Sequence, residues 1–227
     1  MELGFSNEIF DEEEKKKKDS SIQRIICEKC ERPFPDHCIC SSFPENPIEI
    51  QTEVIILQHP KETRVFRTVP IIERCLGSKC TVYRGRKFEE DLYPLLHKQL
   101  QDPSTFLLYP TKEAKNAEFI IKNKETETQV KRLVVLDGTW IHAKKLFNWN
   151  PKLGTISHVK ISSVPNSTYL RKQTQKGNLS TVEAVAFALG ILEENPDISN
   201  QLLKPFHYMM DLQRNFVKSL NLPEREK

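Results

Sequence analysis

The segment spanning residues 131–147 constrains the fold of this chain more than any other part of its sequence. Residues 133–136 form a short, apolar and β-branched run, which is typical of a strand buried on both faces of a sheet. The run ends at Asp137, which begins an Asp-Gly turn signal, and a helical pattern follows with Trp140 and Phe147 on one face. A strand, a tight turn and a helix in this order place Asp137 at the carboxyl end of a central strand, where open α/β sheets bind their ligands.

The same pattern also has a purely structural interpretation. In this alternative Asp137 caps the helix, Gly138 supplies the turn and Trp140 fills the core. Asp is a favoured residue at the helix N-cap. The local pattern alone therefore leaves the roles of Asp137 in ligand binding and in capping open.

Composition favours one sizeable α/β domain with an appendage. The chain has 227 residues, 38% of them hydrophobic, and a net charge of +3, which permits nucleic-acid binding without demanding it. No apolar run approaches the ~20 residues of a membrane span, so we expect no membrane association. The first residues lack the basic and apolar regions of a signal peptide, so we expect an intracellular protein, cytoplasmic or nuclear, with reduced thiols.

Residues 1–24 are expected to form a disordered, charged tail. An acidic run at 11–14 and a basic run at 15–18 leave little that can be buried. The basic run has two interpretations, a localisation signal or, more commonly, a solvated stretch of charge.

Two close cysteine pairs follow the tail within 14 residues, and prolines bend the loop between them. Zn²⁺ favours a tetrahedral thiolate shell at structural sites, although His37 could replace one thiolate. We therefore predict a structural zinc site in a segment spanning residues 25–45. Cys75 and Cys80 each lie beside an apolar segment and are expected to be buried thiols. The predicted zinc ligands are Cys27, Cys30, Cys38 and Cys40.

Residues 46–227 alternate predicted strands with predicted helices, which indicates a mostly parallel sheet. Capping-box spacing from Ser180 to Glu183 marks the start of one helix, and Pro205 should kink or break another. The strands are expected at 53–57, 81–83, 105–109, 133–136 and 157–161. The helices are expected at 68–76, 113–122, 140–147, 184–193 and 198–220.

The sequence lacks the glycine-rich motifs of ATP hydrolysis and of ordinary dinucleotide binding. With only seven glycines it contains neither a G-x-x-x-x-G-K-[ST] loop nor a G-x-G-x-x-G turn after a strand. A ligand would have to be held by loops at the strand ends, and the candidate loops begin at Tyr109, Asp137 and Leu179.

Five sequence blocks occur together over roughly residues 25–195. They are the cysteine cluster, Gln58-His-Pro60 with Arg67-Thr-Val-Pro70, Leu107-Leu-Tyr-Pro110, Asp137-Gly-Thr-Trp140 and Leu179-Ser-Thr-Val-Glu183. In this order the blocks resemble the DTW-domain family, the tRNA-uridine aminocarboxypropyltransferases, whose signature is D-x-T-W. The glycine between Asp and Thr is similar to the eukaryotic-type members.

The resemblance implies a SPOUT-like α/β catalytic domain over residues 46–227, with a C-terminal trefoil knot that general topology rules would argue against. It also implies S-adenosylmethionine as the co-substrate, held in knotted loops. The binding residues that it implies are Tyr109, Pro110, Gly138, Thr139, Trp140, Leu179, Ser180, Thr181 and Glu183.

The implied reaction transfers the 3-amino-3-carboxypropyl group of S-adenosylmethionine to N3 of a tRNA uridine, giving acp3U and 5′-methylthioadenosine. Loss of the weakly acidic N3 proton calls for a positioned base, and Asp137 is our choice of catalytic residue. Alternatively, Asp137 orients the uridine or the amino group of the cofactor. The uridine must be unstacked to enter any such pocket.

Basic residues beside the candidate loops are expected to hold the tRNA backbone. As isolated charges they would be solvated side chains, whereas as three clusters they indicate a phosphate track. Together with His59, the predicted RNA-binding residues are Arg64, Arg67, Arg84, Arg86, Lys87, Arg171 and Lys172.

Two other functions stay open at this level. One is an RNA methyltransferase of the same SPOUT relatives, which would release S-adenosylhomocysteine. The other, from a different class, is a zinc-stabilised RNA-binding protein without catalysis. The sequence specifies neither the tRNA and the uridine position nor the oligomeric state.

Overall fold

The computed structural model describes residues 25–62, 67–125, 128–162 and 179–219. The chain divides into two compact units, Met1–Cys38 and Ile39–Lys227. In the first unit a turn is closed by an antiparallel bridge between Ile26 and Pro33. The predicted tail at 1–24 lies outside the described residues, and within these residues no helix is both long and apolar enough to cross a membrane.

The second unit is built around a six-stranded parallel sheet with the order β2-β1-β5-β3-β6-β4. The mostly parallel sheet expected from the sequence is therefore confirmed. Its strands are β1 (Glu53–Gln58), β2 (Cys80–Arg84), β3 (Thr105–Leu108), β4 (Lys115–Asn116), β5 (Arg132–Asp137) and β6 (Ser157–Lys160).

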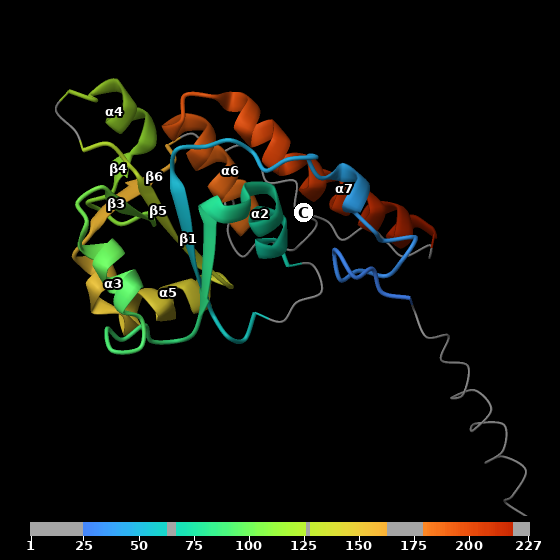
Figure 1. Cartoon of the computed structure of the whole chain (residues 1–227), viewed down its shortest axis with the longest axis horizontal. Coiled ribbons are helices and arrows are strands. Elements are labelled where there is room, and N and C mark those ends of the chain that lie inside the picture. Colours follow the sequence, from blue (N-terminus) through green and yellow to red (C-terminus); the bar gives the residue numbers. More distant parts are fainter. Residues whose placement is uncertain (1–24, 63–66, 126–127, 163–178, 220–227) are drawn as a thin grey trace, which may run out of the picture. The chain divides into compact units, whose positions relative to one another are not determined.

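Helices cover both faces of this sheet, with α3 and α5 on one side and α2, α6 and α7 on the other (Figure 1). They are α2 (Val69–Leu76), α3 (Pro94–Gln101), α4 (Ala117–Lys122), α5 (Trp140–Trp149), α6 (Thr181–Leu192) and α7 (Pro196–Ser219). Short 3-10 turns occur at Cys40–Ser42, Gly77–Lys79 and Pro151–Gly154.

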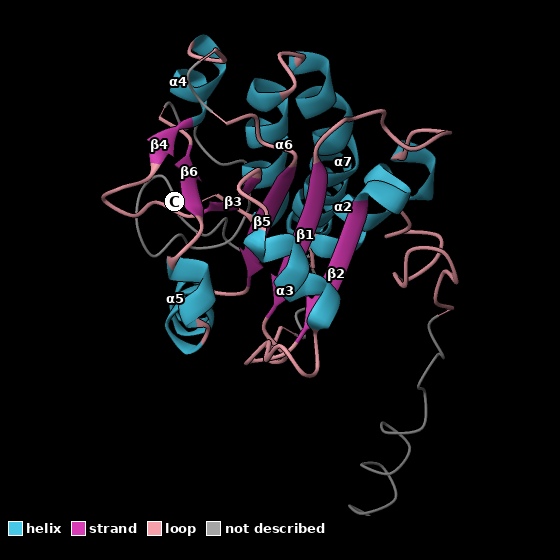
Figure 2. Ribbon diagram, turned by 60° about the vertical axis from the view of Figure 1, so that its left-hand side comes forward, coloured by secondary structure: helices cyan, strands magenta, loops and turns pink. Residues whose placement is uncertain are grey.

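Strand β5 is central and buried, as its apolar run predicts. It lies between β1 on one side and β3 on the other (Figure 2). Its register with β1 places Asp137 opposite Gln58 at the same edge of the sheet. Leu133 and Val134 are fully buried. Alternate residues of β1 and β5 pack against α3 and α5 on one face, so the first turn of α5 is held against the sheet close to Asp137.

Helix α6 has the predicted capping box, although it begins at Thr181 and not at the expected residue 184. The Ser180 hydroxyl accepts a hydrogen bond from the Glu183 backbone N–H, and the Glu183 carboxylate accepts one from the Ser180 N–H at 2.8 Å, which completes a capping box. Most of the segment between β6 and α6, residues 163–178, lies outside the described part of the chain. The trefoil knot therefore stays a prediction.

Three helices differ from the sequence expectation. Helix α3 was not expected, because only Leu96 and Leu100 of its eight residues are buried and the apolar pattern is too sparse. The helix expected at 113–122 begins only at Ala117, since the two residues before it pair with β6 as β4. Of the kink or break expected at Pro205, a break is wrong, because α7 is continuous and its buried apolar side chains hold it in place, and a kink stays a prediction.

Candidate functional site

The carboxylate of Asp137 is the centre of the candidate site. It ends β5, it is only 4% exposed, and each of its oxygens accepts a hydrogen bond from a side chain. Gln58 Nε2, at the end of β1, lies 2.8 Å from Oδ2, and Thr181 Oγ1, at the start of α6, lies 2.6 Å from Oδ1. Residues from three elements thus hold one buried carboxylate at the carboxyl edge of the sheet, where open α/β sheets bind their ligands.

The capping interpretation of this segment is wrong. The N-cap of α5 is Thr139, whose hydroxyl accepts a hydrogen bond from the His142 backbone N–H at 3.2 Å. Trp140 does not fill the core either, because it is 44% exposed. The carboxylate of Asp137 therefore points elsewhere, toward Gln58 and Thr181.

Gly138 is required by the geometry of the turn. Its φ of +151° lies in a region that other residues rarely adopt, and a Cβ atom there would lie 2.8 Å from the Cβ of His142. The same Cβ would lie 3.4 Å from the Cβ of His59. The glycine thus allows two histidines to approach the chain directly after Asp137.

These two histidines form a stack that sequence reasoning missed. The rings of His59 and His142 are 4.0 Å apart and nearly parallel, and Trp149 continues the stack 6.0 Å from His59. The Lys61 backbone N–H donates to His59 Nδ1, which leaves the proton of the neutral ring on Nε2. Burial lowers the pKa of His59, and the charges of His142, Arg86, Lys145 and Lys61 act in the same direction. His59 is only 3% exposed, so an RNA contact by its ring stays a prediction.

The three candidate cofactor loops meet near the end of β5. The ring of Tyr109, just after β3, lies 6.4 Å from that of Trp140 and is stacked on Phe147 at 4.9 Å. Burial raises the pKa of Tyr109. Thr181 bonds directly to Asp137, whereas Glu183 is buried and occupied by the capping box. Pro110, Gly138, Thr139, Leu179 and Ser180 adjoin these residues in sequence.

Arg84, a predicted RNA-binding residue, is connected to Asp137 through the side chain of Gln58. Its Nε donates to Gln58 Oε1 at 2.8 Å, so Arg84 orients the amide that donates to Asp137. Arg86 and Lys87 follow it as exposed residues, and Arg67 precedes α2. The remaining predicted cations, Arg64, Arg171 and Lys172, lie outside the described residues.

Asn150, which sequence reasoning missed, anchors the basic segment 86–88 to α5. Its Oδ1 accepts from the Phe88 backbone N–H at 2.7 Å, and its Nδ2 donates to the carbonyl groups of Arg86 and Leu146. An Asn just after a helix is a recognisable C-cap signal in the sequence. The bonds to residues 62 and 64 positions away are visible only in the folded chain.

The cysteine cluster has the arrangement of a metal site. The four sulfur atoms lie within 4.8 Å of one another, and His37 is not part of the group. Arg74 Nη1 donates to Cys40 Sγ at 3.2 Å, so a cation accompanies one of the sulfurs. Burial raises the pKa of both Cys75 and Cys80 to about 12, which makes those two thiols poor nucleophiles at neutral pH. The clustered residues are Cys27, Cys30, Cys38 and Cys40.

Comparison with known proteins gives one family. The family model described as the DTW domain matches residues 24–214. The chain is 37% identical to mouse tRNA-uridine aminocarboxypropyltransferase 2 over 194 residues, which cover 84% of this chain and 64% of the relative. It is 35% identical to the Drosophila melanogaster protein of the same name, covering 86% and 77%. Arabidopsis thaliana tRNA-uridine aminocarboxypropyltransferase A is 28% identical, covering 89% and 86%.

The match to the mammalian relatives is partial in length. The chain spans about 64% of the macaque and mouse proteins that it matches. No solved structure matches the chain significantly.

Proposed function

The chain belongs to the DTW-domain family, and we propose on this basis that it is a tRNA-uridine aminocarboxypropyltransferase. The reaction would join the 3-amino-3-carboxypropyl group of S-adenosylmethionine to N3 of a uridine in tRNA. The name shared by its relatives supports this substrate and this transfer. The structural observation that carries the proposal is the buried carboxylate of Asp137, held by Gln58 and Thr181 at the ligand-binding edge of a parallel sheet.

The chemistry requires one proton to leave as one bond forms. The N3–C bond forms while the C–S bond breaks, the N3 proton is lost, and 5′-methylthioadenosine departs; the sulfonium of S-adenosylmethionine supplies the leaving group. We propose that Asp137 either accepts this proton or orients the uridine for the reaction. Hydrogen bonds from Gln58 and Thr181 fix the direction of the carboxylate in either role.

We propose that the loops around the end of β5 bind the co-substrate. The exposed ring of Trp140, the adjacent Tyr109 and the hydroxyl groups of Ser180 and Thr181 offer stacking surfaces and hydrogen bonds at these loops. The same proposal includes a SPOUT-like fold with a trefoil knot. The parallel sheet with helices on both faces supports the α/β part of this fold, and the family membership supports the knot.

The tRNA backbone would follow the exposed cations near this edge, Arg86 and Lys87 first among them. Asn150 holds the backbone on both sides of Lys87, which supports the assignment because an ordered backbone segment loses less conformational entropy when its side chains bind a phosphate. Arg64, Arg67, Arg84, Arg171 and Lys172 complete the proposed track. The protein would act inside the cell, where tRNA is found.

For the cysteine cluster we propose zinc with a structural role. Four thiolates around Zn²⁺ at about 2.3 Å in a tetrahedron would be separated by about 3.8 Å. The sulfur of Cys38 lies 3.7 Å from that of Cys27 and 3.9 Å from that of Cys30, which fits such a shell. A closed set of four protein ligands offers no position for a substrate, so the ion would stabilise the fold rather than take part in the transfer.

The proposed function is tested by the small-molecule product. Purified full chain, S-adenosylmethionine and unmodified bulk tRNA should give 5′-methylthioadenosine and a nucleoside heavier than uridine by the aminocarboxypropyl group. S-adenosylhomocysteine as the only product would identify a methyltransferase. Tight tRNA binding without any turnover would identify a binding protein.

A further inference from the structure

A pocket distinct from the Asp137 site lies on the face of the sheet that α3 and α5 cover. Its volume is about 440 Å³, within the range of roughly 300–1,000 Å³ typical of small-molecule sites. Buried side chains of Leu57, Leu100 and Leu153 contribute an apolar lining, and Trp149, which is 36% exposed, contributes an aromatic ring. Neither Asp137 nor any predicted cofactor-binding residue lines it.

One wall of this pocket is held rigidly from two sides. Asn150 bonds to the backbone of Phe88 and Arg86 from the end of α5. From α3, His97 Nε2 lies 2.6 Å from the Phe88 carbonyl oxygen. The segment that carries Lys87 is therefore built into the fold, and the pocket is formed before any ligand arrives.

The charges around the pocket are mixed, and each sign suits a different part of a nucleotide. Lys87 and Lys152 line it, and neither forms an ion pair in the described part of the chain. Two free ammonium groups suit a phosphate. The carboxylate of Glu89, which also lines the pocket, can accept hydrogen bonds only, so it suits the amino group of a base and repels the carbonyl edge of uracil.

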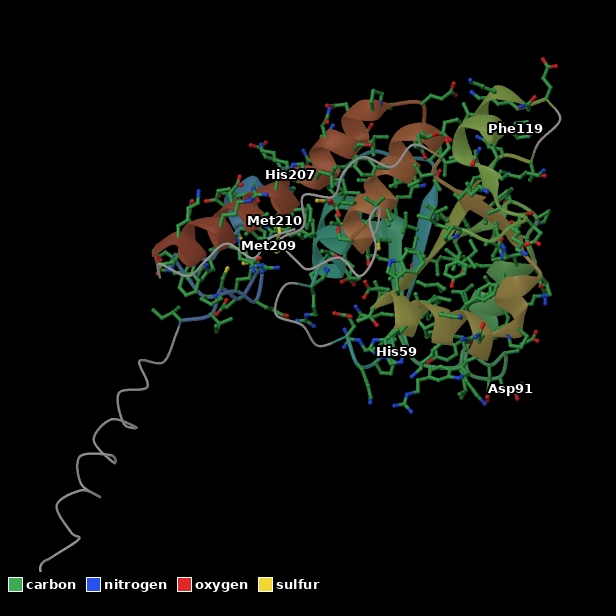
Figure 3. The ribbon with its side chains drawn as sticks, turned by 180° about the vertical axis from the view of Figure 1, so that it is seen from behind. His59, Asp91, Phe119, His207, Met209 and Met210 are labelled. Carbon is green, nitrogen blue, oxygen red and sulfur yellow. The ribbon has the colours of Figure 1, made fainter. Side chains whose placement is uncertain are left out.

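The pocket adjoins the proposed catalytic carboxylate through one aromatic stack. Trp149 stacks on His59, and His59 directly follows Gln58, which donates to Asp137. Figure 3 shows His59 at the same end of the second unit as Asp91, which follows the wall segment in sequence. A nucleotide next to the one at Asp137 is the ligand that this arrangement suits.

We propose that the pocket binds a tRNA nucleobase that carries an exocyclic amino group, from a nucleotide flanking the modified uridine. The base stacks on Trp149 with its amino edge toward Glu89, and its phosphate lies toward Lys87 and Lys152. This inference rests on the proposed action on tRNA. Residues outside the catalytic site would then recognise a nucleotide that flanks the target uridine. Proteins recognise single-stranded RNA by stacking on its bases and by hydrogen bonds to the edges of unpaired bases.

Fluorescence of Trp149 tests the stacking directly. The chain has two tryptophans, so Trp140→Phe leaves Trp149 as the only one. In this background 5′-GMP, 5′-CMP or 5′-AMP should quench the emission with at least a roughly fivefold lower Kd than 5′-UMP, the lower end expected for a good side-chain-to-base contact. Adding Glu89→Gln should remove that difference, whereas Glu113→Gln, the same charge change elsewhere, should keep it. Equal responses to all four nucleotides, or none, would refute the proposal.

A second arm separates tRNA from the adenosine of the co-substrate, which also has an amino group. If the pocket serves tRNA, Trp149→Ala should weaken bulk tRNA binding by roughly 5- to 100-fold. Trp149→Phe should restore most of this affinity, and the KM for S-adenosylmethionine should not change. A raised KM for S-adenosylmethionine in Trp149→Ala with unchanged tRNA affinity would assign the pocket to the co-substrate and overturn the proposal.

The two proposals fail in different ways. Selective nucleotide quenching without 5′-methylthioadenosine production would refute the transferase function and keep the base-binding pocket. Normal transfer with unchanged tRNA affinity in both Trp149→Ala and Glu89→Gln would refute the pocket alone.

Discussion

Replacing Asp137 by Asn removes the negative charge of the candidate catalytic group and keeps its shape. In the parent protein Oδ2 accepts from Gln58 and Oδ1 accepts from Thr181. The Gln58 amide cannot turn over without losing the bond from Arg84 Nε to its oxygen. The Thr181 hydroxyl, however, can accept as well as donate. The Asn side chain should therefore present its oxygen to Gln58 and its NH2 group to Thr181.

The structural cost of this substitution should be small. Both hydrogen bonds are kept, but the group on residue 137 that forms them is now neutral. A hydrogen bond to a charged group contributes about 1 kcal/mol more to stability than one between neutral groups. The free energy of unfolding should therefore fall by no more than about 2 kcal/mol. The N-cap of α5 is Thr139, so the helix keeps its cap.

The catalytic cost should be larger. Loss of a general base slows the chemical step by about 10²–10⁴-fold, which corresponds to about 2.7–5.4 kcal/mol in the barrier. Single-turnover formation of 5′-methylthioadenosine at saturating S-adenosylmethionine measures this step, and urea unfolding measures stability. Because a higher pH supplies more of the N3 anion, raising the pH should partly rescue the variant.

Thr181→Val provides the matched control. It removes one hydrogen bond to the carboxylate without removing the charge. It should therefore lower the free energy of unfolding, and it should slow the chemical step less than Asp137→Asn does. A slow Asp137→Asn variant without rescue at high pH would assign Asp137 to positioning. Parent-like rates in Asp137→Asn would refute a catalytic role for this residue.

Three further perturbations test the metal, the RNA contact and the buried histidine. Cys27→Ser should lose one bound zinc per chain by elemental analysis and lower the Tm, since metal-binding energy at such sites is folding energy, whereas Cys75→Ser should keep the metal. Neutralising Arg86 and Lys87 should flatten the salt dependence of tRNA binding by about one to two phosphate contacts; an unaltered slope would place the RNA on another face. The pKa of His59 is lowered in the folded state, so the unfolded chain binds more protons and stability should decrease as the pH falls below about 6.5. His59→Gln should reduce this decrease in urea unfolding series at pH 5 and pH 7.5, and an unchanged pH dependence would exclude His59 as its source.

Local sequence patterns are enough to predict the elements that carry the candidate site. The apolar run before Asp137 can only be buried on both faces, and the Asp-Gly turn and the following helix depend on neighbouring residues alone. The same holds for the capping box at Ser180 and Glu183, since its hydrogen bonds span three residues. The cysteine spacing likewise predicts the cluster, because a short loop with prolines brings its own ends together.

Elements with weak patterns are determined by their surroundings. Helix α3 has two buried residues and gains its stability from the face of the sheet that it covers, which no pattern within Pro94–Gln101 specifies. Pro205 interrupts the local helical signal, yet buried neighbours such as Phe206 and Met210 keep α7 continuous through it. Packing over many residues outweighs one missing hydrogen bond.

The sequence by itself placed Asp137 at the end of a strand, but it could not distinguish a helix cap from a site residue, because both occupy the same position in a strand-turn-helix pattern. Only the tertiary structure excluded the cap, because the N-cap of α5 is Thr139. The partners of the carboxylate, Gln58 and Thr181, lie 79 and 44 residues away in the sequence. They reach it because β1 pairs in register with β5 and α6 begins at the same edge of the sheet. Hydrogen bonds depend on positions in space, and over such separations these positions are set by the order of the strands and not by any neighbouring residue.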